Sequence, residues 1–298
     1  MDTYDITQTV YYYCSPNTFE NILKDKKLWL CDMMKTNDYR EIDYVLDDII
    51  KAATAQRFEA VLSKEDATLV ETAVKKRIKF YKQCCHWLAI CFSTVSDDLG
   101  QWRAYGGDGC GFAIGFDTEK LKKLEEHKCI HFEEIKYGER AKSKFVKKMV
   151  DQLVEELRVC VNRNSIRSPE GINQKGQTII KAWGDKLTSQ ICFFKSESFS
   201  AEHELRLCYT RMIMAEDLKS ILDIENKPNS LLHNLKATMK RNELHLRLEK
   251  NLPIDAIKEI VIGPQCNISE YEMKIILAIN GIDFNNIIIS TSKATYRH

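Results

Sequence analysis

The chain has 298 residues, of which 44% are hydrophobic and 29% are charged, a composition typical of globular proteins. Its 44 Lys and Arg residues nearly balance its 43 Asp and Glu residues, so no overall electric field attracts nucleic acid or an anionic membrane. The length suffices for one large domain or two small ones, and no apolar run is long enough to span a bilayer.

The 11 cysteines form no recognisable framework, because the sequence has no C-x-x-C pair and no histidine at zinc-finger spacing. Most of them lie within apolar runs, such as residues 88–92 and 191–194, where a free cysteine behaves as a small hydrophobe. The odd count and the lack of a signal peptide predict a cytoplasmic protein without disulfides. We expect no metal site.

The first third of the chain alternates strand and helix patterns. Residues 9–14 are rich in β-formers, and Ser15 followed by Pro16 is a typical start of a short helix, as N-cap and first helical residue. The periodicity predicts further strands at residues 28–31 and 87–93, and helices at residues 42–60 and 65–84.

In the middle of the chain, residues 96–105 are expected to form a helical turn capped by Ser96, and the glycines that follow end it. Residues 110–116 predict a strand in which Gly111 and Gly115 share one face, so a second backbone or an aromatic ring should approach closely there. The remaining pattern predicts a strand at residues 130–137 and a Lys-rich helix at 140–161. A loop is predicted at 163–175 and another helix at 176–189.

The most informative segment is residues 195–209, expected as one strand. In a strand, Glu202, Glu204 and Arg206 would share one face, with His203 on the other. Two neighbouring carboxylates repel, so the cluster either binds a ligand, is neutralised by Arg206 and a second cation, or belongs to an edge strand with a solvated face. We expect Arg206 to pair with one of the two glutamates.

The C-terminal part predicts strands at residues 244–248 and 257–263, a helix at 269–280 and a strand at 286–290. The last three elements are typical of a strand–helix–strand unit. The sequence therefore predicts a single α+β domain over residues 1–298 with a mixed, largely antiparallel sheet core. Helical insertions are expected at about residues 40–85 and 140–190.

Several short motifs follow one another in a characteristic order. They are residues 11–15, residues 28–30, the pair Asn37-Asp38, residues 91–93, Trp102-x-x-Tyr105, residues 111–116, Glu202-x-Glu204-x-Arg206, residues 260–264 and Ser292-x-x-x-Tyr296-Arg297. Together they resemble the bacterial domain-of-unknown-function family 2971 over nearly the whole chain. This resemblance implies no function.

A fainter resemblance is to the ADP-ribosyltransferase fold. Members carry His or Arg and a small residue on a first strand, a hydroxyl residue on a middle strand, and the catalytic Glu, sometimes as Glu-x-Glu, on a late strand. In this chain the matching positions are Tyr13 to Ser15 with the helix that follows, Ser93, and Glu202 with Glu204. Tyr13 departs from the usual His, although a phenol can also donate a hydrogen bond.

The resemblance implies an enzyme that consumes NAD, by ADP-ribosyl transfer or by hydrolysis, as a bacterial defence effector or toxin. Glu204 would stabilise the oxocarbenium-like ribose, and Glu202 would tune transfer against hydrolysis, with Tyr13 as a third catalytic residue. Trp102 and Tyr105 would lie beside the nicotinamide, and Arg103, Lys195 and Arg206 beside the phosphates. Four polar residues would also bind the substrate: Ser15, Ser93, Asn37 and Asp38.

Two other classes of function remain open from the residues alone. A non-catalytic ligand- or protein-binding module, such as a sensor in a defence system, would keep the same fold. A nuclease would need Asp38, Glu41, Glu202 and Glu204 to hold Mg²⁺, but their spacing matches no familiar metal motif. The expected partners are NAD or a related nucleotide, and a protein, a nucleic acid or a regulatory chain, but not a membrane.

Overall fold

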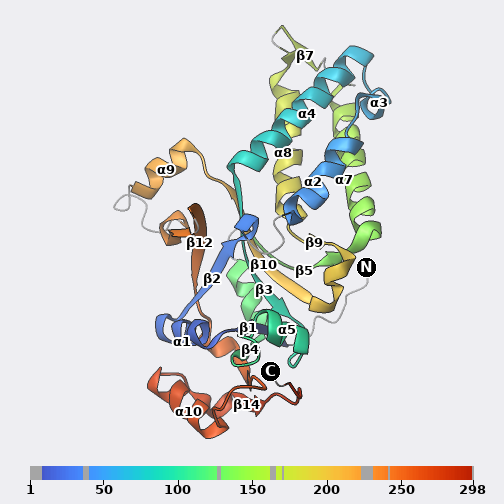
Figure 1. Cartoon of the computed structure of the whole chain (residues 1–298). Helices are drawn as coiled ribbons and strands as arrows, with labels where there is room; N and C mark the ends of the chain where they lie inside the picture. Colours follow the sequence, from blue (N-terminus) through green and yellow to red (C-terminus); the bar gives the residue numbers. More distant parts are fainter. Residues whose placement is uncertain are drawn as a thin grey trace.

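The computed structural model describes residues 9–35, 40–125, 129–161, 166–169, 171–222, 231–240 and 242–296. Within these residues a ten-stranded sheet forms the centre of the molecule (Figure 1). Its strands are β1 (Thr9–Cys14), β2 (Lys27–Asp32), β3 (Cys85–Ser93), β4 (Phe112–Asp117), β5 (Ile130–Glu134), β10 (Glu204–Met212), β11 (Leu235–Lys240), β12 (Glu243–Asn251), β13 (Ile257–Ile262) and β14 (Ile288–Thr291).

The helices lie on both sides of this sheet and above it in Figure 1. They are α1 (Pro16–Asp25), α2 (Glu41–Ala52), α3 (Ala55–Phe58), α4 (Lys64–Cys84), α5 (Leu99–Ala104), α6 (Thr118–Lys122), α7 (Gly138–Val161), α8 (Gln174–Ile191), α9 (Ala215–Leu222) and α10 (Glu270–Ile279). Short 3₁₀ turns include η1 (Met33–Lys35), η2 (Lys123–Glu125), η3 (Glu197–Glu202), η4 (Leu231–Asn234), η5 (Ile254–Ala256) and η6 (Phe284–Asn286).

The sheet is largely antiparallel, as expected. Its order is β11-β12-β2-β3-β1-β4-β13-β14, with β10 between β3 and β5. The pair β13–β14 is parallel and connected through α10, which confirms the predicted strand–helix–strand unit. Two small pairs lie outside the main sheet: β6 (Lys136–Tyr137) runs parallel to β9 (Phe194–Lys195), and β7 (Arg167–Ser168) runs antiparallel to β8 (Gly171–Ile172).

Strand β3 organises the sheet. On one edge it pairs with β10 from Cys85 to Ser93. The other edge is shared by two strands, because β2 pairs near Ala89 and β1 pairs at Ser93. Tyr11, Ser93 and Glu204 are therefore opposite one another on three adjacent strands, and their side chains project from one face of the sheet.

The two faces of the sheet are covered differently. One face packs into a continuous apolar core that includes Leu88, Ile90, Phe92, Leu205 and Leu207. The other face carries two separate apolar clusters, a large one under the helices and a small one of Tyr13, Trp102, Ala113 and Val261. Polar side chains of β3 and β10 occupy the face between these two clusters.

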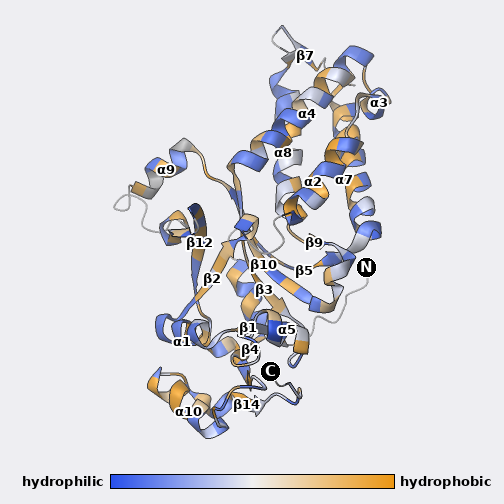
Figure 2. Ribbon diagram, in the orientation of Figure 1, coloured by the Kyte–Doolittle hydropathy of each residue, from blue (hydrophilic) through white to orange (hydrophobic). Residues whose placement is uncertain are grey.

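The large cluster is the core of a helical bundle built from two stretches of chain. Helices α2, α3 and α4 precede β3, whereas α7 and α8 lie between β6 and β9. Apolar residues concentrate where these helices face one another (Figure 2). These helices lie within residues 41–84 and 138–191, where the sequence predicts helices. Among the described helices, none combines the length and apolar composition needed to cross a bilayer.

Three sequence-based expectations are corrected by the fold. The helix predicted over residues 42–60 is two helices, because Thr54 is extended between α2 and α3. The helical turn α5 is capped by Asp98, whose Oδ1 accepts from the Gln101 amide at 2.8 Å, and not by Ser96. Strand β11 was not expected, because most of its side chains are exposed and leave no alternating apolar pattern.

The segment 195–209 is also not one strand. Residues 197–202 form η3, His203 adopts a left-handed conformation with φ of 47°, and β10 begins at Glu204. Glu204 and Arg206 do share a strand face, as predicted, whereas Glu202 lies before the strand. The expectation that all three share one strand is therefore wrong for Glu202.

Candidate functional site

Arg206 lies at the centre of a buried group of charged side chains between the helical bundle and the sheet. Its Nε donates to Glu204 Oε1 at 2.7 Å, which confirms the predicted pair. A terminal guanidinium nitrogen donates to Glu41 Oε1 on α2 at 2.7 Å, and the other donates to the Cys192 carbonyl at 2.5 Å. Arg206 is only 1% exposed, so protein groups and not water surround its charge.

Lys195, on β9, supplies the second cation. Its Nζ donates to Glu204 Oε2 at 2.8 Å and to Glu202 Oε2 at 2.5 Å. Each carboxylate oxygen of Glu204 thus accepts from a different cation. We call Glu41, Lys195, Glu202, Glu204 and Arg206 the charge cluster.

Burial and the neighbouring opposite charges act against each other on Glu204, Glu41 and Lys195. Burial disfavours the charged form of Glu204, but Arg206 and Lys195 outweigh it and lower its pKa. Burial raises the pKa of Glu41, because Arg206 offsets only part of the desolvation there. Burial also opposes the charge of Lys195, yet the carboxylates of Glu204 and Glu41 raise its pKa. Glu204 is therefore held in its ionised form, whereas Glu41 is easier to protonate than an ordinary glutamate.

Glu202 and Tyr105 lie on the solvent side of Glu204. The Tyr105 hydroxyl donates to Glu202 Oε1 at 2.9 Å, and Tyr105 is 43% exposed whereas Glu204 is 4% exposed. From β6, the Tyr137 hydroxyl accepts from the Glu204 backbone amide at 2.9 Å. The sequence did not predict the contact of Tyr137 with Glu204 or that of Glu41 with Arg206. Neither Tyr137 nor Glu41 lies in a local motif with Glu204.

Ser93 connects this cluster to the first strand. The Ser93 hydroxyl donates to the Glu202 carbonyl at 3.0 Å and accepts from the Val95 amide at 3.2 Å. The Tyr13 hydroxyl donates to the Val95 carbonyl at 2.8 Å and accepts from the Asp98 amide at 3.0 Å. Tyr13 and Ser93 thus fix the turn between β3 and α5 that brings Tyr105 over Glu202.

Trp102 is wholly buried beneath this turn. Its ring meets that of Tyr13 edge to face with centroids 4.7 Å apart, and its Nε1 donates to Asp97 Oδ1 at 2.7 Å. Asp97 also accepts from the Ser292 hydroxyl at 2.5 Å and the Lys293 amide at 2.7 Å. Asp97, which the sequence did not single out, thus joins α5 to the C-terminal segment.

The remaining predicted site residues lie apart from the charge cluster or outside the described residues. Ser15 caps α1 by accepting from the Thr18 amide at 3.3 Å, as predicted. Arg103 lies over the Tyr296 ring, 5.7 Å from its centroid. Asn37 and Asp38 lie outside the described residues.

A pocket of about 410 Å³ adjoins the charge cluster and runs along α2. Lys195 and Glu41 belong to its lining, and Glu204 does not. The other lining residues combine charged, aromatic and hydroxyl side chains: Arg40, Asp43, Tyr44, Asp47, Asp48, Lys51, Ser196, Ser198 and Phe199. The pocket offers groups for a ligand that carries both polar and ring components.

Within the described part of the chain, no three His, Cys, Asp or Glu side chains are arranged to hold a metal ion. Glu41, Glu202 and Glu204, which the nuclease hypothesis needs as Mg²⁺ ligands, each accept from Lys195 or Arg206 instead. All eleven cysteines are free thiols.

Comparison with known proteins gives one partial match. No curated protein and no solved structure matches the chain. The model of a family described as a protein of unknown function (DUF2971) matches residues 101–207. The match begins within α5 and ends within β10, so it includes Trp102, Tyr105, Lys195, Glu202, Glu204 and Arg206 and leaves out Tyr13 and Ser93. Over the segment that carries most of the charge cluster, this chain is therefore similar to the DUF2971 family.

Proposed function

We propose that this chain cleaves the bond between nicotinamide and ribose in NAD, either to transfer ADP-ribose or to hydrolyse NAD. Glu204 is the proposed catalytic carboxylate, and Glu202 the residue that positions or activates the acceptor. Tyr13 and Ser93 hold the turn above them. The fold proposed with this activity is ADP-ribosyltransferase-like.

The observation that carries the proposal is the position of Glu204, paired with Lys195 and Arg206, on the shared face of β1, β3 and β10. Departure of nicotinamide leaves positive charge on the ribose, and a carboxylate that stays ionised near neutral pH stabilises that charge. Arg206 and Lys195 lower the pKa of Glu204 despite its burial. Ser93 lies opposite Glu204 and Tyr11 opposite Ser93, so the three proposed sequence motifs come from adjacent strands.

In the proposed reaction, access to Glu204 requires the side chains above it to move. Tyr105 and Glu202 hydrogen-bond to each other on the solvent side, and Tyr105, which is 43% exposed, would turn toward solvent. Lys195 would then exchange its contact with Glu202 for one with a substrate phosphate or hydroxyl and keep its contact with Glu204. The pocket beside Lys195 provides room for part of the substrate.

A second candidate function is a non-catalytic binding or sensor module. It is favoured by the 4% exposure of Glu204 and by the pairing of both its oxygens with cations, an arrangement also typical of a structural ion cluster. In that case a ligand would occupy the 410 Å³ pocket and contact Lys195 and Glu41 without reaching Glu204.

The experiment that separates the two is to follow free nicotinamide when the full chain is incubated with NAD. Glu204→Gln keeps the shape of the side chain but removes its charge, so turnover should fall by about 10²–10³ while NAD binding changes little. Glu197→Gln is the matched control, because Glu197 lies on the same short helix η3 as Glu202 but is exposed.

Thermal unfolding of each variant would separate lost chemistry from lost folding. Release of nicotinamide by Glu204→Gln at the wild-type rate would contradict the catalytic role. If the wild type releases no nicotinamide but a ligand binds saturably in the pocket beside Lys195, the binding module is favoured.

A further inference from the structure

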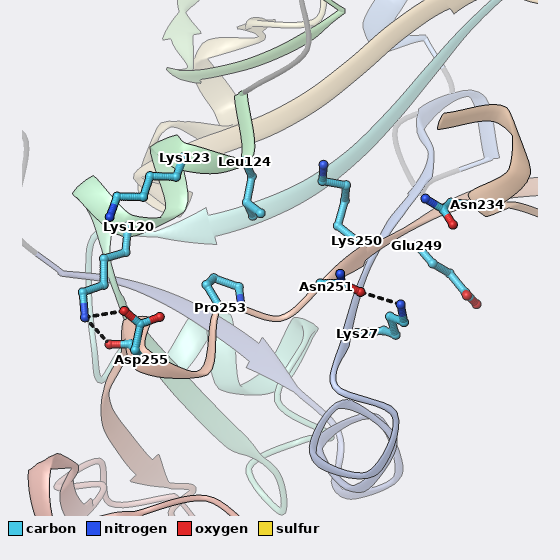
Figure 3. A pocket seen from close by; sticks show the side chains of 10 residues that line it. All are labelled: Lys27, Lys120, Lys123, Leu124, Asn234, Glu249, Lys250, Asn251, Pro253 and Asp255. Atoms are coloured by element: carbon cyan, nitrogen blue, oxygen red, sulfur yellow. Dashed lines mark hydrogen bonds and ion pairs between the residues drawn. The ribbon is translucent and has the colours of Figure 1, made fainter. Parts of the chain in front are cut away.

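A second pocket, which shares no residue with the charge cluster, has a volume of about 430 Å³ and a lining dominated by lysine (Figure 3). It lies where the start of β2 and the end of β12 meet α6, η2 and η5. Lys27, Lys120, Lys123 and Lys250 line it, together with Glu249 and Asp255 as the acidic lining residues. Lys27, Lys120 and Lys250 are half-buried, although lysine is usually exposed.

The positive charge of this lining is only partly compensated by its own carboxylates. Asp255 accepts from Lys120 at 2.8 Å, and Glu249 pairs with Arg247, which is not a lining residue, at 3.3 Å. Lys27 donates to the neutral amide oxygen of Asn251 at 2.6 Å, so that contact leaves its charge in place. The lining therefore has more cations than carboxylates, and each carboxylate already has a cation beside it.

The frame of the pocket is held by contacts between separate elements. Lys27 and Asn251 are register partners in the β2–β12 pair, and the Leu252 amide donates to the Lys26 carbonyl at 2.8 Å. Lys120 also donates to the Asp255 carbonyl at 2.6 Å, which joins α6 to η5. Leu124 and Pro253 add apolar surface beside the lysines. A ligand would thus meet a largely preformed site.

We propose that this pocket binds a small phosphate-bearing molecule of nucleotide size. Its volume falls within the range of small-molecule sites, roughly 300–1,000 Å³. The four lysines of the lining supply cations for the phosphates of such a molecule, while Leu124 and Pro253 provide a surface for a sugar or base. The proposal does not depend on NAD cleavage at Glu204.

The test is calorimetric titration of the full chain with ADP, inorganic pyrophosphate and adenosine. ADP and pyrophosphate should bind saturably, and more weakly as salt increases, whereas adenosine should bind at least about tenfold more weakly than ADP. The double variant Lys123→Glu with Lys27→Gln should weaken ADP binding by at least about tenfold, because it reverses one charge and removes another.

Lys122→Glu is the matched control. Lys122 neighbours Lys123 and pairs with Glu119, but it does not line the pocket, so its replacement should leave ADP affinity within about twofold of the wild type. The proposal would be overturned by an absence of saturable ADP binding at millimolar concentration, or by equal affinities for adenosine and ADP. It would also be overturned if the double variant bound ADP as tightly as the wild type, which would place ADP elsewhere on the chain.

Discussion

Glu41 and Arg206 are separated by 165 positions in the chain, yet their side chains meet at 2.7 Å between α2 and β10. Both residues are almost completely buried. The ion pair therefore joins the helical bundle to the sheet at a point where neither side chain can turn to solvent. Desolvation offsets much of the attraction in such a pair, so its main effect is to fix the position of the bundle on the sheet.

We expect Arg206→Ala to destabilise the fold strongly. The substitution leaves Glu41 without its hydrogen-bonded cation and Glu204 with only Lys195, and an uncompensated buried charge costs about 3–5 kcal/mol. Urea denaturation followed by circular dichroism measures the free energy of unfolding.

Arg158→Ala is the control for this prediction. Arg158 pairs with Glu155 on the exposed face of α7 at 2.9 Å, and such a surface pair contributes at most about 1 kcal/mol. Equal free energies of unfolding for the two variants would show that the charge cluster contributes no more than a surface ion pair.

The stability difference between wild type and Glu204→Gln should depend on pH. The folded-state pKa of Glu204 lies below its ordinary value of 4.5, so ionised Glu204 stabilises the fold above about that pH, and this stabilisation is lost as pH falls through the folded-state pKa. The wild type should thus lose more stability than Glu204→Gln when denaturation curves are compared at pH 7 and at pH values below about 4. A difference that stays constant across this range would contradict the lowered pKa.

Gly111→Ala should destabilise the strand pairing around the candidate site. A Cβ atom there would lie 2.1 Å from the Cys14 carbonyl oxygen and 2.8 Å from that of Gly106, and backbone atoms cannot move away cheaply. Overpacking of this kind costs about 1–3 kcal/mol or more. Gly100→Ala is the comparison, because its Cβ would meet only the Asp98 side chain, at 3.0 Å. Thermal unfolding temperatures of both variants check the prediction, and a smaller loss for Gly111→Ala than for Gly100→Ala would contradict it.

If the chain cleaves NAD, Glu202→Gln should retain more nicotinamide release than Glu204→Gln. Glu202 contacts Lys195 and Tyr105 at the solvent side, where an acceptor would arrive. Its substitution should therefore change the ratio of ADP-ribose transferred to free ADP-ribose more than the total rate. Chromatography of the products with an added acceptor measures this ratio. The assignment of the two roles would be wrong if Glu202→Gln abolished release and Glu204→Gln did not.

Local patterns predicted much of the fold. The start of α1 at Ser15 and Pro16 and the parallel β13–β14 unit are as expected. The close approach at Gly111 and Gly115 is also as expected, since a Cβ would meet the Cys14 carbonyl oxygen at Gly111 and the Tyr11 ring at Gly115, although Gly111 precedes β4. Each of these depends on residues close in sequence or on the space that a side chain needs.

The candidate site was less predictable, because its contacts are made between distant segments. The pair of Arg206 with Glu204 follows from strand alternation, but the second pair with Glu41 depends on how α2 packs against the sheet. His203 in a left-handed conformation removes Glu202 from the strand, and no alternation pattern signals such a break.

The position of Glu41 also has a consequence for the order in which the chain folds during synthesis. Helix α2 is synthesised early. Arg206, the cation that pairs with Glu41, is synthesised only after all helices of the bundle and the first two residues of β10. Until then, burial of the unpaired Glu41 carboxylate is unfavourable, so we expect α2, α3 and α4 to leave it exposed to water. We therefore expect the bundle to complete its burial only after Arg206 has been synthesised, late in translation.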